Sequence, residues 1–279
     1  MSHPVATLRL VDAAVPRHAI SVTGGKGGVG KSTIALNIAI ACAGQRARTL
    51  MVDTGLGTAD LNLMLGIAPQ RTMLDALGGM PIDQVLAEAH GITLLPALNG
   101  SYALSTIGPA TQRRLLDLVD SLASRFDTLV VDVAAGIGQV QTAIAGATAQ
   151  TLVVVNPEAL SIASAYACLK VLVAEQGLRH AYVVPNRVRS QLQVDEIMAS
   201  VGMLVGRFLD LEVTTLPAIP LDPAVAEAAE LGVPLLVYAP DAPAARAIRA
   251  LTRALGQATP AARATPWMRS LPISRGETR

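Results

Sequence analysis

The sequence contains few cysteines, few aromatic residues and few charged residues. Its two cysteines, Cys42 and Cys168, form no CxxC pair, so we expect reduced, buried thiols and no thiolate-bound zinc or iron–sulfur site within this chain. Aromatic residues make up only 3%, which argues against a surface that stacks nucleic-acid bases. The net charge of +1 provides no bulk attraction to nucleic acid or to an anionic membrane.

Signals for secretion or membrane insertion are also not expected. Residues 1–18 lack the basic start, the long apolar run and the small-residue cleavage site of a signal peptide. Residues 133–157 carry no charge, but glycine and glutamine interrupt them, and their period changes from helical to strand-like near Thr151. We therefore expect a buried helix followed by a core strand, in a soluble protein of the cytoplasm.

Hydrophobic residues, in contrast, make up 51% of the chain, which is enough for a large buried core. Short runs rich in Val, Ile or Leu alternate with helical patterns, and the runs lack the polar alternation of a half-exposed sheet. The predicted strands are Ala19–Thr23, Thr49–Asp53, Ile92–Pro96, Thr128–Asp132, Leu152–Asn156, Tyr182–Pro185 and a segment near Thr215–Ile219. The predicted helices include Thr111–Arg125, Ser161–Glu175, Pro223–Leu231 and Ala242–Leu255. This alternation predicts a single α/β domain with a doubly wound, mostly parallel sheet.

A glycine-rich loop follows the first predicted strand. Residues 25–32 read GKGGVGKS, which satisfies the P-loop pattern, and a helical pattern follows at once. Such a loop turns several backbone N–H groups toward one polyphosphate at the positive end of a helix. The pattern predicts that Lys31 reaches the β- and γ-phosphates and that the Ser32 hydroxyl binds Mg²⁺. The predicted nucleotide-binding residues of the loop are Gly25, Gly27, Gly28, Val29, Gly30, Lys31, Ser32 and Thr33.

The loop contains an additional lysine, Lys26, and with it the chain resembles the deviant Walker A ATPases of the MinD/ParA superfamily, which read KGGxGK[ST]. The resemblance extends to about residue 255. It implies a P-loop NTPase fold of the SIMIBI type, with ATP and Mg²⁺ as cofactors. It also implies that Lys26 reaches the partner's phosphates in an ATP-bound homodimer, because cations must neutralise two facing polyphosphates.

The same resemblance assigns roles to residues after the loop. Asp132, in FDTLVVDVAAGIG, matches the Walker B aspartate, and Asp53 matches the first acidic residue of the first switch segment. With Ser32 they would hold Mg²⁺, the aspartates through water. With Lys26 and Lys31, the two aspartates form the predicted catalytic set. Asn186 of VVPNRV would recognise adenine, with Arg187 beside the base and Pro220 packed on it.

The segments DTGLGTADLNLMLG, VVDVAAGIG and PEALSIASAYACLKVL resemble the flagellar-number branch of the superfamily, called FlhG or FleN. The chain departs from the family pattern at several positions. Gly55 stands where a second aspartate usually positions the attacking water, Asp60 and Asn62 are exchanged, and Ser164 replaces an aspartate at the dimer face. These departures predict intact nucleotide binding with slow hydrolysis, unless Asp60 takes the missing role.

Three functions remain open from the sequence. The first is an ATP-dependent dimerising switch that regulates flagellar number or placement through a protein partner. The second is a slow or inactive ATP-binding scaffold that titrates a transcription activator or assembly factor. The third is a ParA-type positioner on DNA, which would use the arginine stripe Arg246, Arg249 and Arg253.

The two ends of the chain bear on where the protein acts. The expected organisation is an N-terminal extension (1–17), an ATPase domain (18–256) and a loose tail (257–279). Trp267, Met268, Leu271 and Ile273 could touch lipid, although Pro266 and Pro272 oppose a helix there. We expect a cytoplasmic protein that can be recruited to the inner face of the membrane or to the cell pole. The Gln-Ala segment with which flagellar relatives stimulate a GTPase partner is not found in residues 1–18.

Overall fold

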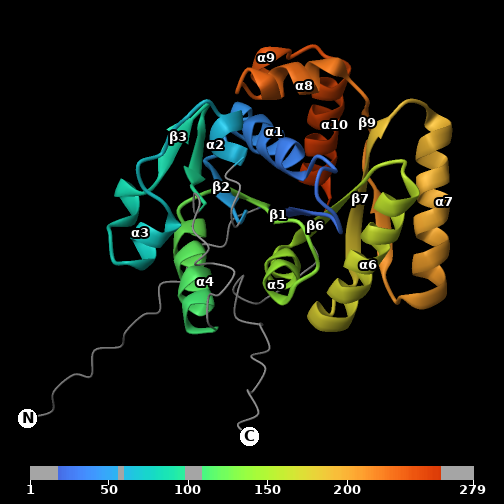
Figure 1. Cartoon of the computed structure of the whole chain (residues 1–279), viewed down its shortest axis with the longest axis horizontal. Coiled ribbons are helices and arrows are strands. Elements are labelled where there is room, and N and C mark those ends of the chain that lie inside the picture. Colours follow the sequence, from blue (N-terminus) through green and yellow to red (C-terminus); the bar gives the residue numbers. More distant parts are fainter. Residues whose placement is uncertain (1–17, 56–59, 98–108, 259–279) are drawn as a thin grey trace, which may run out of the picture.

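The computed structural model describes residues 18–55, 60–97 and 109–258 of the chain. These residues form one sheet covered by helices on both faces (Figure 1). The strands are β1 (His18–Thr23), β2 (Thr49–Asp53), β3 (Ala87–Ala89), β4 (Ile92–Leu95), β5 (Thr128–Asp132), β6 (Gln150–Val155), β7 (His180–Val188), β8 (Glu212–Thr215) and β9 (Ile219–Pro220). The helices are α1 (Lys31–Gly44), α2 (Asp60–Met64), α3 (Met73–Leu77), the 3₁₀ helix η1 (Ile82–Gln84), α4 (Pro109–Ala123), α5 (Gln139–Ala147), α6 (Ala159–Gln176), α7 (Gln191–Phe208), α8 (Pro223–Glu230), α9 (Leu235–Tyr238) and α10 (Pro243–Gln257).

The sheet has the strand order β3-β4-β2-β5-β1-β6-β7-β8, and β9 pairs with the end of β7. The edge strand β3 runs antiparallel to β4, whereas the other pairs among the described strands are parallel. The parallel strands therefore share one carboxyl edge, where ligands bind in open α/β sheets. The predicted doubly wound, mostly parallel sheet is confirmed.

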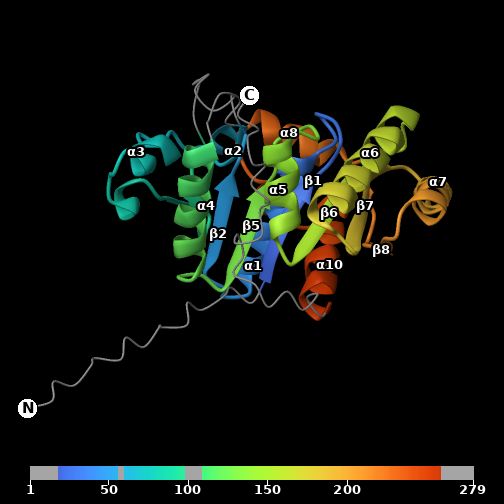
Figure 2. The same cartoon turned by 90° about the horizontal axis from the view of Figure 1, so that it is seen from below.

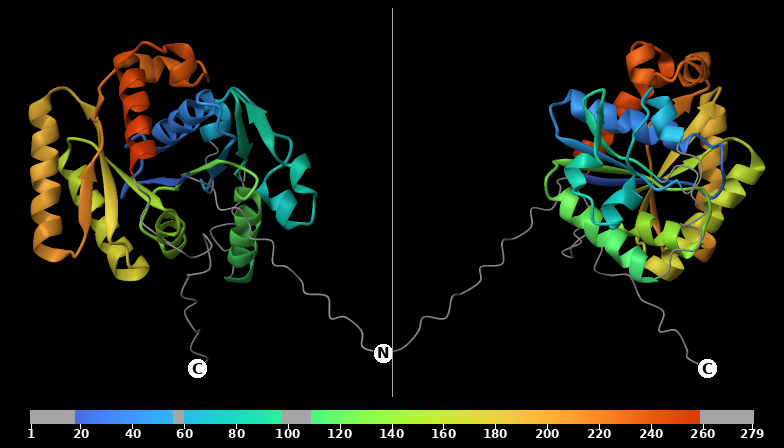
Figure 3. Two further views of the ribbon diagram at one scale, coloured as in Figure 1. Left: turned by 180° about the vertical axis from the view of Figure 1, so that it is seen from behind. Right: turned by 60° about the vertical axis from the view of Figure 1, so that its left-hand side comes forward.

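Two hydrophobic cores lie on opposite sides of the sheet. Successive side chains of a strand point to opposite faces, and in β5 Leu129 and Val131 enter one core while Val130 enters the other. Helices α4, α5, α6 and α7 cover the first face (Figure 2), and α1, α8, α9 and α10 cover the second. Seen from behind, α10 packs against α1, the helix that follows the P-loop (Figure 3).

Most predicted elements are present. Strands β2 and β5 have the predicted bounds, and the uncharged stretch 133–157 contains α5 followed by β6, as expected. The predicted strand near Thr215–Ile219 is wrong: β8 ends at Thr215 and β9 begins at Ile219. Pro217 lies between them, and proline has no N–H to donate to a sheet.

One described helix, α6, is as long and apolar as a membrane span, with 18 residues and a mean hydropathy of 1.2. Its buried side chains, which include Leu169 and Leu172, belong to the core under the sheet. The helix packs against β6, α5 and α7. This is the position of a covering helix in a layered α/β domain.

Candidate functional site

The glycine-rich loop connects β1 to α1 at the carboxyl edge of the sheet. Gly30 is the N-cap of α1 and has φ 97°, a left-handed conformation that favours glycine. No side chain caps this helix end, so its first N–H groups are available to an anion, and the helix dipole favours negative charge there. The loop thus has the geometry of a phosphate cradle.

Helix α6 packs closely on the start of this loop. A Cβ atom placed on Gly25 would lie 1.8 Å from the main-chain oxygen of Ser164, which no side chain could tolerate. Gly25 is therefore required for this contact. The loop and α6 therefore lie in direct contact at Ser164, one of several residues at which we expect the chain to depart from the family pattern.

The two lysines of the loop point to different places. Lys31 is buried, and its Nζ donates to the carbonyl of Lys26 at 3.3 Å. Burial lowers the pKa of Lys31, and the nearby carboxylate of Asp132 opposes this effect. The Nζ of Lys26 instead lies 3.2 Å from the carboxylate of Glu158, in an exposed ion pair at the start of α6.

Two carboxylates lie next to each other at the ends of neighbouring strands. Asp53 of β2 and Asp132 of β5 are partners in the parallel register and are only 2% and 6% exposed. The Oδ1 atom of Asp53 accepts a hydrogen bond from the N–H of Gly55 at 2.8 Å. Together with the hydroxyl of Ser32, at the start of α1, they supply the oxygen donors that Mg²⁺ prefers. The residues present therefore fit a magnesium ion beside the loop.

A pocket of about 580 Å³ opens beside the loop. Its walls include Gly30 and Thr33 of the phosphate cradle together with Asn186, Arg187 and Pro220, the three residues predicted to surround the base. The volume lies in the range of small-molecule sites. The structure thus brings two of the predicted phosphate-loop residues and all three predicted base residues to one cavity, and the individual roles stay predictions.

The end of β7 is shaped to form this pocket. The register of β7 against β9 shifts between Asn186 and Val188, and Arg187, between them, has φ 57°. A left-handed residue other than glycine costs roughly 1–2 kcal/mol, so the surrounding contacts must hold Arg187 in place. The buried amide of Asn186 donates to the carbonyl of Val29 at 2.8 Å, which fixes it against the loop.

Several residues of the site were not predicted from the sequence. Glu158, Arg189 and Gln193 line the pocket, and so does Asp222, which caps the neighbouring helix α8. Their positions depend on contacts between distant segments, and no short motif marks them. The P-loop, Asp132 and Asn186 carried such motifs.

The sequence departures are placed as follows. Asn62 is buried on α2, and Ser164 is half-buried on α6. Asp60 begins α2, but the position of its side chain lies outside the described part of the structure, as do residues 1–17 and 259–279. The proposed replacement of the missing carboxylate by Asp60 therefore stays a prediction.

The two cysteines lie on opposite faces of the sheet. Cys168 of α6 is buried in one core, and Cys42 of α1 packs against the other. Burial raises the pKa of each thiol to about 11, so both are protonated at neutral pH. A single chain cannot bring them to one metal ion.

This strand–loop–helix arrangement, with an acidic strand end beside it, defines the chain as a P-loop NTPase. A family model described as ParA, NUBPL iron-transfer P-loop NTPase, matches residues 16–256. The chain is 33% identical to the antiactivator FleN of Pseudomonas aeruginosa over 217 residues, which cover 77% of this chain and 78% of FleN. It is also 32% identical to the flagellum site-determining protein YlxH of Helicobacter pylori, over 54% of this chain and 52% of YlxH.

Solved structures give the same classification. The structure of the MinC:MinD cell division protein complex of Aquifex aeolicus contains a chain with a TM-score of 0.69 and 28% identity, covering 88% of this chain and 99% of that one. MinD of Pyrococcus horikoshii, complexed with Mg-ADP, has a TM-score of 0.72 and 22% identity, covering 86% and 96%. The chain belongs to the ParA/MinD family of P-loop ATPases, on the side of FleN and YlxH, and its cofactors are ATP and Mg²⁺.

Proposed function

We propose that this chain is a MinD-like ATPase that dimerises when it binds ATP and regulates the number or placement of flagella through a protein partner. Lys31, Ser32 and Thr33 bind the phosphates, and Asn186, Arg187 and Pro220 hold the adenine. Ser32 holds Mg²⁺, with Asp53 and Asp132 acting through water. When bound, the ion would supply positive charge beside the phosphates.

The observation that carries the dimer proposal is the different direction of the two loop lysines. Lys31 is buried inside its own loop, whereas Lys26 extends outward to Glu158 at the rim of the pocket. An exposed ion pair of this kind is worth about 0–1 kcal/mol, so a polyphosphate on a second subunit can easily displace it. Lys26 is thus available to act across a homodimer interface.

Hydrolysis is proposed to be slow. Gly55 places a backbone N–H near Asp53, but it has no side chain to orient a water molecule. Phosphoryl transfer depends mainly on positioning and electrostatics, so losing a water-orienting group slows chemistry more than it weakens binding. The bound ATP would then persist, and the dimer with it.

The proposed partner is a protein. FleN is named an antiactivator, YlxH is named a flagellum site-determining protein, and MinD forms a complex with MinC. The FleN similarity and Gly55 together also favour a second candidate function. In that case the chain is an ATP-binding scaffold that sequesters a transcription activator. ATP hydrolysis then serves only to end the ATP-bound state.

The arginine stripe gives less support to a DNA-bound positioner. Arg246 and Arg249 donate to the carbonyls of Asp241 and Pro240, so both secure the entry to α10.

We propose residues 18–256 as the ATPase domain, between the extension 1–17 and the tail 257–279. We further propose a cytoplasmic protein, with recruitment to the membrane or the pole as an accessory property.

The nucleotide assignment is tested by calorimetry with Lys31→Ala. The variant should bind ATP at least about 100-fold more weakly, because the buried ammonium makes charge-assisted contacts to phosphate. Lys170→Ala, which removes an exposed lysine from α6, is the matched control and should bind like the natural chain. Undiminished affinity in Lys31→Ala would remove the nucleotide assignment.

A further inference from the structure

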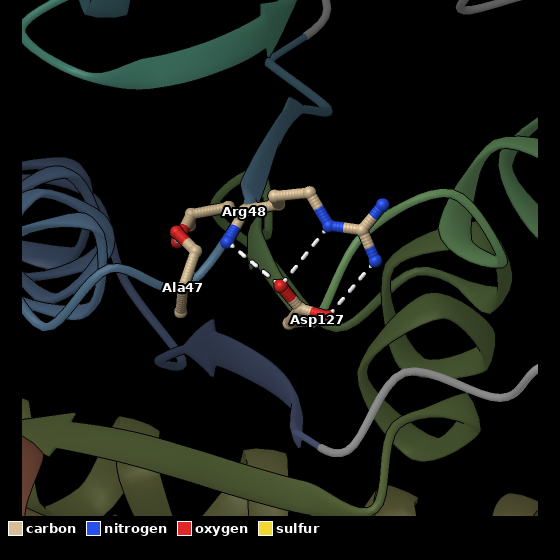
Figure 4. A network of polar contacts seen from close by, with 4 residues as sticks. Ala47, Arg48 and Asp127 are labelled. Carbon is tan, nitrogen blue, oxygen red and sulfur yellow. Dashed lines mark hydrogen bonds and ion pairs between the residues drawn. The ribbon is translucent and has the colours of Figure 1, made fainter.

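Strands β2 and β5 carry the two acidic residues of the site, and they are fastened together at both ends. Their register runs without a shift from Thr49 opposite Thr128 to Asp53 opposite Asp132. At the edge away from the nucleotide site, Arg48 donates to Asp127 through its main-chain N, Nε and Nη2 at 3.0–3.1 Å (Figure 4). The relative position of the strands is therefore fixed before they reach the site.

At the site edge, Thr54 makes the corresponding connection. Its N–H donates to the carbonyl of Asp132 at 3.1 Å, and its hydroxyl donates to the same oxygen at 2.7 Å. The hydroxyl oxygen also accepts a hydrogen bond from the N–H of Ala134 at 3.1 Å. Thr54 is only 9% exposed, so these bonds are shielded from water.

The side chain of Thr54 here takes the place of its own backbone. In a regular parallel ladder, a residue that donates to one carbonyl accepts from the N–H two residues further along the partner strand. The N–H of Ala134 would therefore bond to the main-chain carbonyl of Thr54, but it bonds to the hydroxyl instead. The main chain can then leave the sheet at Gly55 while the two segments remain joined.

We propose that Thr54 is a positioning residue that sets the spacing of Asp53 and Asp132 and thereby the affinity of the nucleotide site for Mg²⁺. Asp53 directly precedes Thr54 in the chain. The main-chain carbonyl of Asp132 accepts hydrogen bonds from both the N–H and the hydroxyl of Thr54. Because the segments that leave β2 and β5 share this one hydroxyl, they move together. This inference rests on the proposed nucleotide site.

The test compares Thr54→Val, which keeps a similar shape but has no hydroxyl, with Thr54→Ser, which keeps the hydroxyl. ATP affinity is measured by calorimetry over a series of Mg²⁺ concentrations and in EDTA. Thr54→Val should raise the Mg²⁺ concentration that gives half of the gain in ATP affinity by about three- to tenfold. The affinity for ATP measured in EDTA should stay unchanged. Thr54→Ser should restore the natural Mg²⁺ dependence.

A second measurement needs no nucleotide. Hydrogen exchange of the Ala134 amide in the natural chain and in Thr54→Val should differ by about tenfold or more, with Thr54→Ser near the natural value. Thr252→Val is the matched control, because Thr252 is a buried threonine of α10 whose hydroxyl donates to the carbonyl of Ile248. That variant should alter stability without altering Mg²⁺ dependence.

The outcomes separate this inference from the proposed function. If the natural chain binds Mg–ATP and Thr54→Val shows the same Mg²⁺ dependence, or loses affinity equally in EDTA, Thr54 has only a structural role. Unchanged exchange of the Ala134 amide would also overturn the inference. A natural chain that binds no ATP would instead contradict the nucleotide site itself, and the inference with it.

Discussion

Gly55 is the residue at which the sequence predicts the main chemical departure from the family pattern. Gly55 follows Thr54, whose hydroxyl donates a hydrogen bond to the main-chain carbonyl of Asp132. The N–H of Gly55 donates to the carboxylate of Asp53 and so orients it. The backbone of the first switch segment is therefore already organised at this position. Gly55 itself has no side chain that could hold a water molecule.

Adding that side chain should accelerate hydrolysis. Gly55→Asp is expected to raise the turnover of ATP by about tenfold or more, since a positioned acid or base contributes typically 10²–10⁴-fold. Its affinity for ATP should change little, because the carboxylate acts on water and not on the bound nucleotide. Steady-state phosphate release and calorimetry measure the two quantities.

Gly55→Ala is the control for backbone strain, since it adds a side chain without a carboxylate. Equal acceleration in both variants would show that loop stiffness, and not the new acid, is responsible. If the natural chain already turns over quickly and Asp60→Ala stops it, Asp60 has the missing role and the slow-hydrolysis proposal is wrong.

The sequence predicted those parts of the site that carry local motifs. The glycines of the loop and Lys31 follow from a fixed spacing after a buried strand, whereas Asp132 was predicted from its place at the end of an apolar strand and from the resemblance to the family. Thr54 and Glu158 could not be predicted in this way. Their bonds join them to Asp132 and Lys26, which are 78 and 132 residues away along the chain.

Among the helices, α8 and α10 share one capping residue. The Oδ1 atom of Asp222 accepts from the N–H of Ala224 at 3.0 Å, and its Oδ2 atom accepts from the N–H of Ala244 at 2.9 Å. One carboxylate therefore satisfies the first turns of both helices. Because Asp222 also lines the base pocket, the start of α10 is tied to the nucleotide site.

Removing this carboxylate should destabilise both helices. Asp222→Ala is expected to lower the free energy of unfolding by about 2 kcal/mol, since a single lost cap costs ~1 kcal/mol. Urea denaturation measures the change. Ser190→Ala, which removes the single cap of α7, should cost about half as much. Equal losses in the two variants would contradict the shared cap.

At the element scale, the apolar runs predicted β2 and β5 to the residue, because strands buried on both faces are continuous apolar segments. Helix α7 was not among the predicted helices. Its sequence contains Gly202 and Gly206, and each glycine inside a helix costs about 1 kcal/mol, which weakens the pattern. Packing of Val194, Ile197, Val201 and Val205 into the core compensates.

The whole molecule places every part of the proposed switch at one edge of one sheet. The loop after β1, the acidic ends of β2 and β5, and the base pocket at the end of β7 all lie there because the strands are parallel. In the proposed homodimer, the nucleotide phosphates and the charges that face them would hold the two subunits together. Lys26 is the residue on which that proposal depends most.

The most direct test is the mass in solution of the natural chain and of Lys26→Ala, measured by light scattering with Mg–ATP and with Mg–ADP. We expect a dimer of the natural chain in Mg–ATP and a monomer in Mg–ADP. Lys26→Ala should bind ATP and remain a monomer in both. A dimer of the natural chain that forms without ATP, or a Lys26→Ala variant that dimerises with ATP, would contradict the proposed role of Lys26 in an ATP-dependent homodimer.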